Sequence, residues 1–174
     1  MKKQTKSQTV LLCRAGIVAA LYAGLTMAFG SLAYGPLQIR PAEALCILPL
    51  FFPETIPGLF IGCMLANLLS GYGAIDIVLG SLTTLVASAC TYLIGRALKE
   101  GIVSFLLGGI PPVILNAIVI PFVIILASPD GGMATYWVFF FQMLITQSVW
   151  VFGLGLPVFL GISQLRKMKV RYFI

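Results

Sequence analysis

The chain has 174 residues, a mean hydropathy of +1.06 and only 9% charged residues, with a formal net charge of +6. A water-soluble domain of this length needs far more polar residues to cover its surface, so the composition predicts an integral membrane protein. Histidine is absent and each of the four cysteines stands alone in an apolar segment, which argues against a zinc site, a haem ligand and a histidine-based triad. We therefore expect neither a metal nor a cofactor.

Six apolar segments predict an all-α membrane protein with six transmembrane helices in a single domain, residues 1–174. A spanning helix needs about 20 mostly apolar residues, and this length accommodates about six of them with short connections. The expected spans are about 10–33, 42–53, 56–72, 75–95, 102–127 and 133–162.

The first span contains a stripe of small residues. Ala15, Ala19 and Ala23 recur at every fourth position, with Gly16, Ala20 and Gly24 beside them. Such a stripe permits close approach of another helix. It either packs within the chain or docks on another membrane protein, and the stripe alone does not distinguish the two.

The second span, AEALCILPLFFP, is too short to cross an ordinary bilayer and contains Pro49 and Pro53. Lipid leaves unpaired backbone groups unsatisfied. We therefore expect a short or broken helix that its neighbours shelter.

The basic residues indicate the orientation. All of them except Arg40 lie near the two ends of the chain or in the 96–101 loop. Loops rich in lysine and arginine face the cytoplasm. The sequence therefore predicts a multi-pass protein of the cell membrane with both termini cytoplasmic, and loops near 34–42, 73–75 and 128–132 on the outside.

Uncommon polar residues concentrate in the outer half of the predicted spans. Ionisable groups at membrane depth are costly, usually face the protein interior and suggest a ligand pathway. Aromatic residues near the same boundary suit an interfacial belt but also offer stacking faces for a planar ligand. The candidate substrate-binding residues are Tyr34, Gln38, Arg40, Glu43, Asn67, Asp76, Asn116, Trp137 and Gln142. The alternative is a set of helix–helix hydrogen bonds in which Arg40 and Glu43 pair with each other.

No motif predicts an enzyme. The chain has no Walker A phosphate loop, and the glycine-rich GLGLPVFLG lacks the strand context of a nucleotide fingerprint. Two classes remain, a binding and transport subunit or a structural membrane protein that assembles through its helix faces. The clustered polar residues favour the first.

Two segments carry a family resemblance. YGPLQIRPAEALCILP, at 34–49, and GLFIGCMLANLLSGYGAIDIVLGSLTTLVAS, at 58–88, resemble signature segments of the QueT family. These proteins are the substrate-binding S components of energy-coupling factor (ECF) transporters for queuosine precursors. The resemblance implies the six-helix S-component fold and an outward-facing site. It also implies docking of the small-residue face of the first helix, Ala15, Ala19 and Ala23, on a transmembrane coupling subunit, with two partner ATPase subunits supplying the energy.

The ligand that the resemblance implies is a 7-deazaguanine such as the aminomethyl precursor of queuosine, preQ1. Its guanine-like edge offers N–H donors to a carboxylate, and its ammonium requires an anion. Glu43 and Asp76 are the candidate carboxylates, and the sequence does not say which takes which group. Alternatively Arg40 neutralises Glu43 and leaves Asp76 as the free charge. An S component for another vitamin or base remains the alternative within transport.

Overall fold

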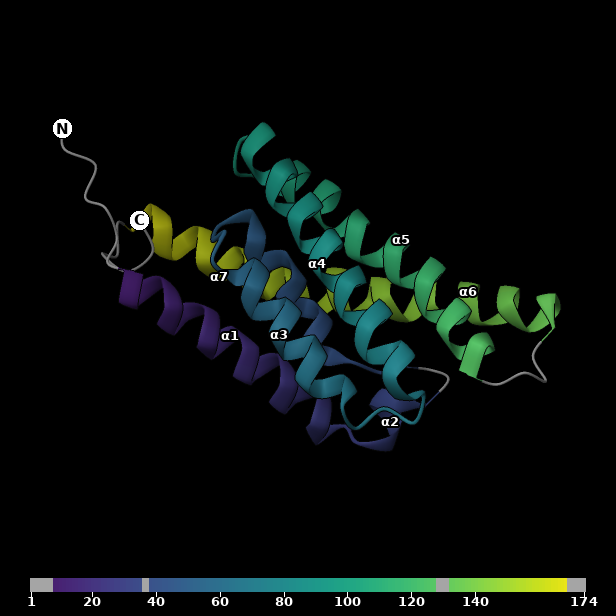
Figure 1. Ribbon diagram of the computed structural model, residues 1–174. Coiled ribbons are helices and arrows are strands. Elements are labelled where there is room, and N and C mark those ends of the chain that lie inside the picture. The colour runs from purple at the N-terminus through teal and green to yellow at the C-terminus, as the bar shows by residue number, and fades with distance from the viewer. Residues whose placement is uncertain (1–7, 36–37, 128–131, 169–174) are drawn as a thin grey trace.

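The structure is a computed structural model that describes residues 8–35, 38–127 and 132–168, and within these ranges it is a helical bundle without strands (Figure 1). Two elements are not α-helices, because η1 is a 3₁₀ helix and η2 is a π-helical segment. The elements in chain order are α1 (Gln8–Ala28), α2 (Ser31–Tyr34), η1 (Pro41–Leu50), α3 (Thr55–Asn67), α4 (Gly73–Ala97), α5 (Ile102–Ala127), α6 (Met133–Ser148), η2 (Val149–Leu154) and α7 (Gly155–Lys167).

The all-helical prediction is confirmed for the described residues, and four helical segments are long and apolar enough to span a membrane. They are α1, α4, α5 and the continuous helix from Met133 to Lys167. The other two predicted spans are the shorter apolar helices η1 and α3. The 13 residues of α3 extend about 20 Å at ~1.5 Å per residue, against a hydrocarbon core of ~30 Å. Six complete crossings therefore remain a prediction.

The second predicted span is short, as expected, and lies at the centre of the bundle. The helix found there is the ten-residue η1, Pro41–Leu50, in place of the predicted span 42–53, with Pro41 at its start and Pro49 inside. Helices α1, α3, α4, α5 and α7 and the segment η2 all contact it. Neighbouring helices thus shield its irregular backbone, which is the condition under which such backbone is tolerated at membrane depth.

Helices α1 and α3 approach closely through small residues. A Cβ added at Gly62 would lie 2.8 Å from the Ala19 carbonyl oxygen, and one at Gly58 would lie 2.6 Å from that of Ala15. Ala19 and Ala23 are buried and Ala15 is half-buried. This corrects the predicted docking role of Ala15, Ala19 and Ala23, because their stripe is occupied by α3 within the same chain.

A second small-residue stripe on α1 is exposed. Gly16, Ala20 and Gly24 face away from the bundle. A Cβ added at Gly16 or Gly24 would meet no atom within 4 Å. In the described chain this stripe, rather than the alanine stripe, is open to a second helix.

The beginning of α1 and the end of α7 lie at the same end of the bundle (Figure 1). Arg14 pairs with Glu54 at 2.8 Å, and Arg166 lies 5.6 Å from the ring of Phe51, so both helices meet the connection between η1 and α3. Arg166 also pairs with Glu100 at 3.2 Å, which brings the α4–α5 connection to this end. The basic residues that predicted the cytoplasmic side are therefore together wherever the structure describes them.

This arrangement predicts the result of cysteine labelling. In a Cys13→Ser background on intact cells, a membrane-impermeant maleimide should label Gly71→Cys, which is exposed at the end opposite the basic residues. It should not label Lys99→Cys until the cells are permeabilised. Labelling of position 99 but not of position 71 in intact cells would reverse the orientation.

The close contact between α1 and α3 predicts a stability effect. Gly62→Ala should lower the free energy of unfolding in detergent by about 1–3 kcal/mol, because the new methyl group overlaps the Ala19 backbone. Gly161→Ala is the matched control, since this glycine of α7 is exposed and has open space around it. The control should be neutral or slightly stabilising, because alanine favours the helix. Equal effects of the two substitutions would contradict the packing described.

Candidate functional site

A polar cavity lies inside the bundle. It is too narrow in this structure to admit a water molecule. Helices α3, α4, α5 and α6 contribute to it, together with η1 and the segment before η1. Its lining residues are Gln38, Arg40, Glu43, Cys63, Gly80, Thr84, Asn116, Ile120 and Gln147. Ligand pockets typically enclose about 300–1,000 Å³, so the cavity is in a closed form.

Glu43 projects into this cavity from the first turn of η1. Its side chain is buried, with only 2% of the residue exposed. One carboxylate oxygen accepts a hydrogen bond of 2.6 Å from the Tyr22 hydroxyl, and the other accepts from Asn116 Nδ2 and Cys46 Sγ, each at 3.3 Å. None of the ion pairs among the described residues includes Glu43. Its negative charge is therefore hydrogen-bonded but not neutralised by a cation there.

Arg40 pairs with Asp76 and not with Glu43. Its Nη2 lies 3.8 Å from Asp76 Oδ2, while Nη1 donates to Asn67 Oδ1 and Nε donates to the Ala33 carbonyl oxygen, both at 3.0 Å. The guanidinium also lies 5.7 Å from the centre of the Tyr34 ring. This corrects the alternative in which Arg40 neutralises Glu43 and leaves Asp76 as the free charge.

Asp76 and Asn67 hold the arginine in place without lining the cavity. Asp76 Oδ2 accepts from the Ser70 hydroxyl at 2.5 Å, and Asn67 Nδ2 donates to the Asp76 carbonyl oxygen at 3.0 Å. A Cβ added at Gly80 would lie 2.7 Å from Asn67 Nδ2, so α4 can approach this network only because position 80 is glycine. The network fixes one guanidinium, and the charge of Glu43 remains in excess.

Three buried polar atoms on the cavity wall have no hydrogen-bond partner in the described chain: Gln38 Nε2, Arg40 Nη2 and Gln147 Oε1. Gln38 also has a φ of 44°, a backbone conformation that non-glycine residues rarely adopt. An unpaired buried donor or acceptor costs about 1–3 kcal/mol. Such atoms call for an explanation, and partners on a bound molecule would supply one.

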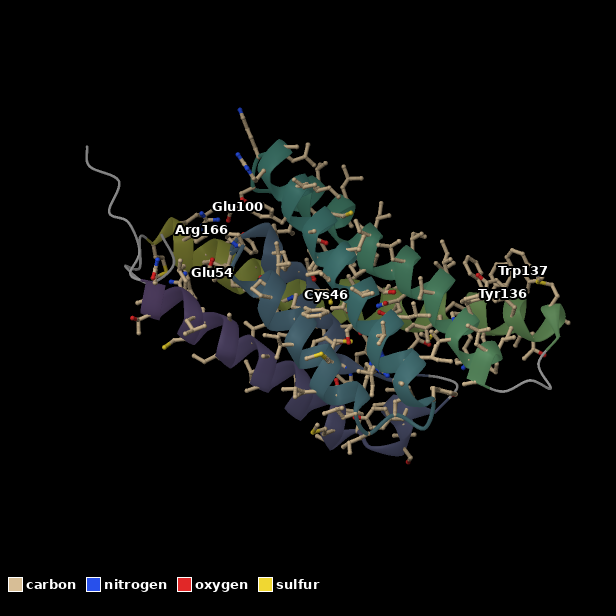
Figure 2. All side chains as sticks on the ribbon, viewed as in Figure 1. Cys46, Glu54, Glu100, Tyr136, Trp137 and Arg166 are labelled. Atoms are coloured by element: carbon tan, nitrogen blue, oxygen red, sulfur yellow. The ribbon has the colours of Figure 1, made fainter. Side chains whose placement is uncertain are left out.

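The nine predicted residues fall into three groups. Gln38, Arg40, Glu43 and Asn116 line the cavity, whereas Tyr34, Asn67 and Asp76 contact Arg40. Trp137 is 50% exposed and packs against Tyr136, Phe140 and Phe141 near the beginning of α6 (Figure 2). Gln142 is half-buried and does not line the cavity.

Sequence reasoning missed Gln147, which lines the cavity from the same helix as Gln142. A signal was present, because Thr146, Gln147 and Ser148 interrupt an apolar run with three polar side chains. It also missed Tyr22, whose hydroxyl donates to Glu43 from α1. A tyrosine surrounded by alanine and leucine gives no sign of that contact.

Comparison with known proteins gives one family. The model of the QueT transporter family matches residues 12–164. The chain is also 39% identical over 97 residues to the queuosine precursor transporter QueT of Lactococcus lactis subsp. cremoris (strain MG1363). That match covers 55% of this chain and 57% of the relative, so it spans little more than half of either protein. No solved structure matches the chain.

The matched range includes all the cavity-lining residues, which lie on α3, α4, α5, α6 and η1 and in the segment before η1. With its long apolar helices, the protein is a multi-pass membrane protein. It belongs to the QueT transporter family.

Proposed function

We propose that this chain is the substrate-binding S component of an ECF importer and that it captures a cationic 7-deazaguanine, a queuosine precursor such as preQ1. The observation that carries the proposal is a buried carboxylate, Glu43, in a polar cavity without a cationic partner among the described residues. Family membership and the name of the Lactococcus relative support the substrate class.

The charges of the site favour a cationic ligand. Arg40 and Asp76 compensate each other, whereas Glu43 is held only by a hydroxyl, an amide and a thiol. A buried carboxylate without a counterion is costly, and a ligand ammonium would offset that cost. Glu43 is therefore the proposed partner of the aminomethyl group.

The unpaired atoms complement a guanine-like edge. Gln38 Nε2 and Arg40 Nη2 are donors that a ring carbonyl would satisfy, and Gln147 Oε1 is an acceptor for a ring or exocyclic N–H. Because the site is closed, the ligand would enter only after the cavity widens. Asp76 then acts through Arg40 and does not itself touch the ligand.

The exposed stripe of α1 is the proposed contact with the coupling subunit. Gly16, Ala20 and Gly24 allow a partner helix to approach closely at a surface that no described part of this chain covers. Two ATPase subunits would supply the energy, and the chain itself would be no enzyme. In this proposal the protein crosses the membrane six times with both termini in the cytoplasm.

Binding measurements on two acidic variants test the ligand assignment. Glu43→Gln should weaken preQ1 binding by roughly 30-fold to several-thousand-fold, because losing a charged partner costs on the order of 2–5 kcal/mol. It should weaken an uncharged nitrile analogue much less. Asp76→Asn should weaken both ligands to a similar extent, since it acts through Arg40. Calorimetry in detergent gives the dissociation constants.

The control for these variants is Glu100→Gln, a partly exposed carboxylate at the opposite end, which should leave both dissociation constants within about threefold of wild type. If Glu43→Gln and Asp76→Asn both keep the dissociation constants of the wild type, the ligand assignment is wrong. Preferential binding of riboflavin, thiamine or biotin would identify a different S component. Binding of no ligand at all would favour a structural subunit.

Substitutions on two faces of α1 test the docking surface. Ala20→Trp should abolish uptake and co-purification with the coupling subunit while ligand binding persists, because a large side chain prevents close helix approach. Ala19→Trp should instead disrupt the fold, since this position packs on α3. Leu82→Trp, on the exposed face of α4, is the control and should preserve uptake. Normal assembly of the Ala20→Trp protein would refute this docking surface.

A further inference from the structure

A second cavity lies at the end of the bundle that carries the basic residues. It is a cleft of about 520 Å³ between the beginning of α5 and the last turns of α7. Figure 2 shows Glu100 and Arg166, two of its lining residues, side by side at this end. None of its lining residues lines the polar cavity around Glu43. The binding site described above therefore does not account for the cleft.

The polar part of the cleft suits an anion. Ser163 is only 8% exposed, lines the cleft, and has a hydroxyl without a hydrogen-bond partner among the described residues. Arg166 and Lys167 lie one turn further along α7, and with Glu100 the charged lining groups sum to +1. Gly101 directly precedes Ile102, the first residue of α5. The N–H groups at the start of a helix have no partners within the helix and favour negative charge.

The rest of the cleft is apolar and reaches the outer surface of the bundle. Ile102 is 53% exposed and Leu160 is 48% exposed, while the buried Phe159 forms part of the wall. A free phosphate ion would make no favourable contact with these apolar side chains. An amphiphile with an anionic head and a hydrocarbon chain fits both parts.

We propose that this cleft binds an anionic phospholipid of the membrane leaflet at the end where α1 begins and α7 finishes. The phosphate accepts hydrogen bonds from Ser163 and the first turn of α5, and Lys167 supplies the positive charge. Arg166 is shared between the phosphate and Glu100. One acyl chain lies against Ile102 and Leu160. Basic clefts between transmembrane helices at this depth are suited to anionic headgroups.

Thermal unfolding of the purified full-length chain in neutral detergent tests the proposal. Phosphatidylglycerol at about 100 times its dissociation constant should raise the unfolding temperature by about 5–10 °C. Phosphatidylcholine with the same acyl chains should have little effect. Native mass spectrometry should detect one retained phosphatidylglycerol per chain.

Two variants locate the headgroup. Lys167→Gln and Ser163→Ala should each weaken phosphatidylglycerol binding about tenfold, whereas Lys99→Gln, a charge at the same end that does not line the cleft, should leave it unchanged. Without lipid, Ser163→Ala should unfold at the same temperature as wild type or higher, because it removes an unpaired buried hydroxyl. That readout separates loss of binding from loss of stability.

Several outcomes would overturn the proposal. Equal stabilisation by phosphatidylcholine would mean that the headgroup is not recognised, and an equal effect of inorganic phosphate would identify a free-ion site. Equal losses in Lys99→Gln and Lys167→Gln would indicate general surface charge. If Lys167→Gln keeps the lipid effect but loses association with a coupling subunit, the cleft is a protein interface.

Discussion

The requirement on which this structure depends is the solvation of three ionisable side chains that water does not reach. Arg40, Glu43 and Asp76 are each at most 2% exposed, in a bundle whose outer surface is apolar. Lipid offers no hydrogen bonds, so each charge must find its partners within the protein. Five elements contribute hydrogen-bond or ion-pair partners of these charges or line the cavity beside them: α1, η1, α3, α4 and α5. The placement of η1 at the centre of the bundle follows from that need.

The charged groups divide the bundle into two ends of different character. Among the described residues, the end where α1 begins carries the exposed and partly exposed charges, with pairs such as Arg14–Glu54 and Arg166–Glu100. The opposite half contains the buried network, in which acidic groups outnumber the one guanidinium. Surface pairs contribute little to stability, whereas removing one member of a buried pair is costly. The two ends therefore differ in how strongly sequence change should affect folding.

The sequence predicted much of this arrangement, and the limits of the prediction have physical causes. Buried charges are conspicuous because they are costly in lipid, so Arg40, Glu43 and Asp76 stood out. The pairing of these three residues could not be read from the sequence. Arg40 precedes η1 in an extended conformation, and its side chain points back towards Ala33 and α3. Proximity along the chain had suggested Glu43 as the partner of Arg40. Only the spatial arrangement of η1 and α4 decides between the two acids.

The small-residue stripes illustrate a related limit. Gly58 and Gly62 of α3 can accept a close helix, and α1 offers two adjacent stripes that could meet them. Which stripe faces inward depends on the rotation of α1 about its axis, and that rotation is fixed partly by the Tyr22–Glu43 hydrogen bond. The choice of Gln142 had a different cause, because this residue was selected for its place in the outer half of the span, whereas Gln147, further along the same helix, faces the cavity.

The π-helical segment η2 has a consequence for how this helix can change during evolution. It follows Ser148, the residue after Gln147, and precedes Phe159 within one continuous helix. Each residue of an α-helix turns the chain by about 100°, so a π-turn shifts the facing of everything that follows it. If all the residues of η2 wound as regular α-helix, Gln147 would still face the cavity, but Phe159 would turn away from Phe51 and Phe105. A π-turn holds one extra residue, so the loss of one residue from η2 converts it to regular α-helix and keeps the facing of both residues. The same deletion elsewhere in this helix would not.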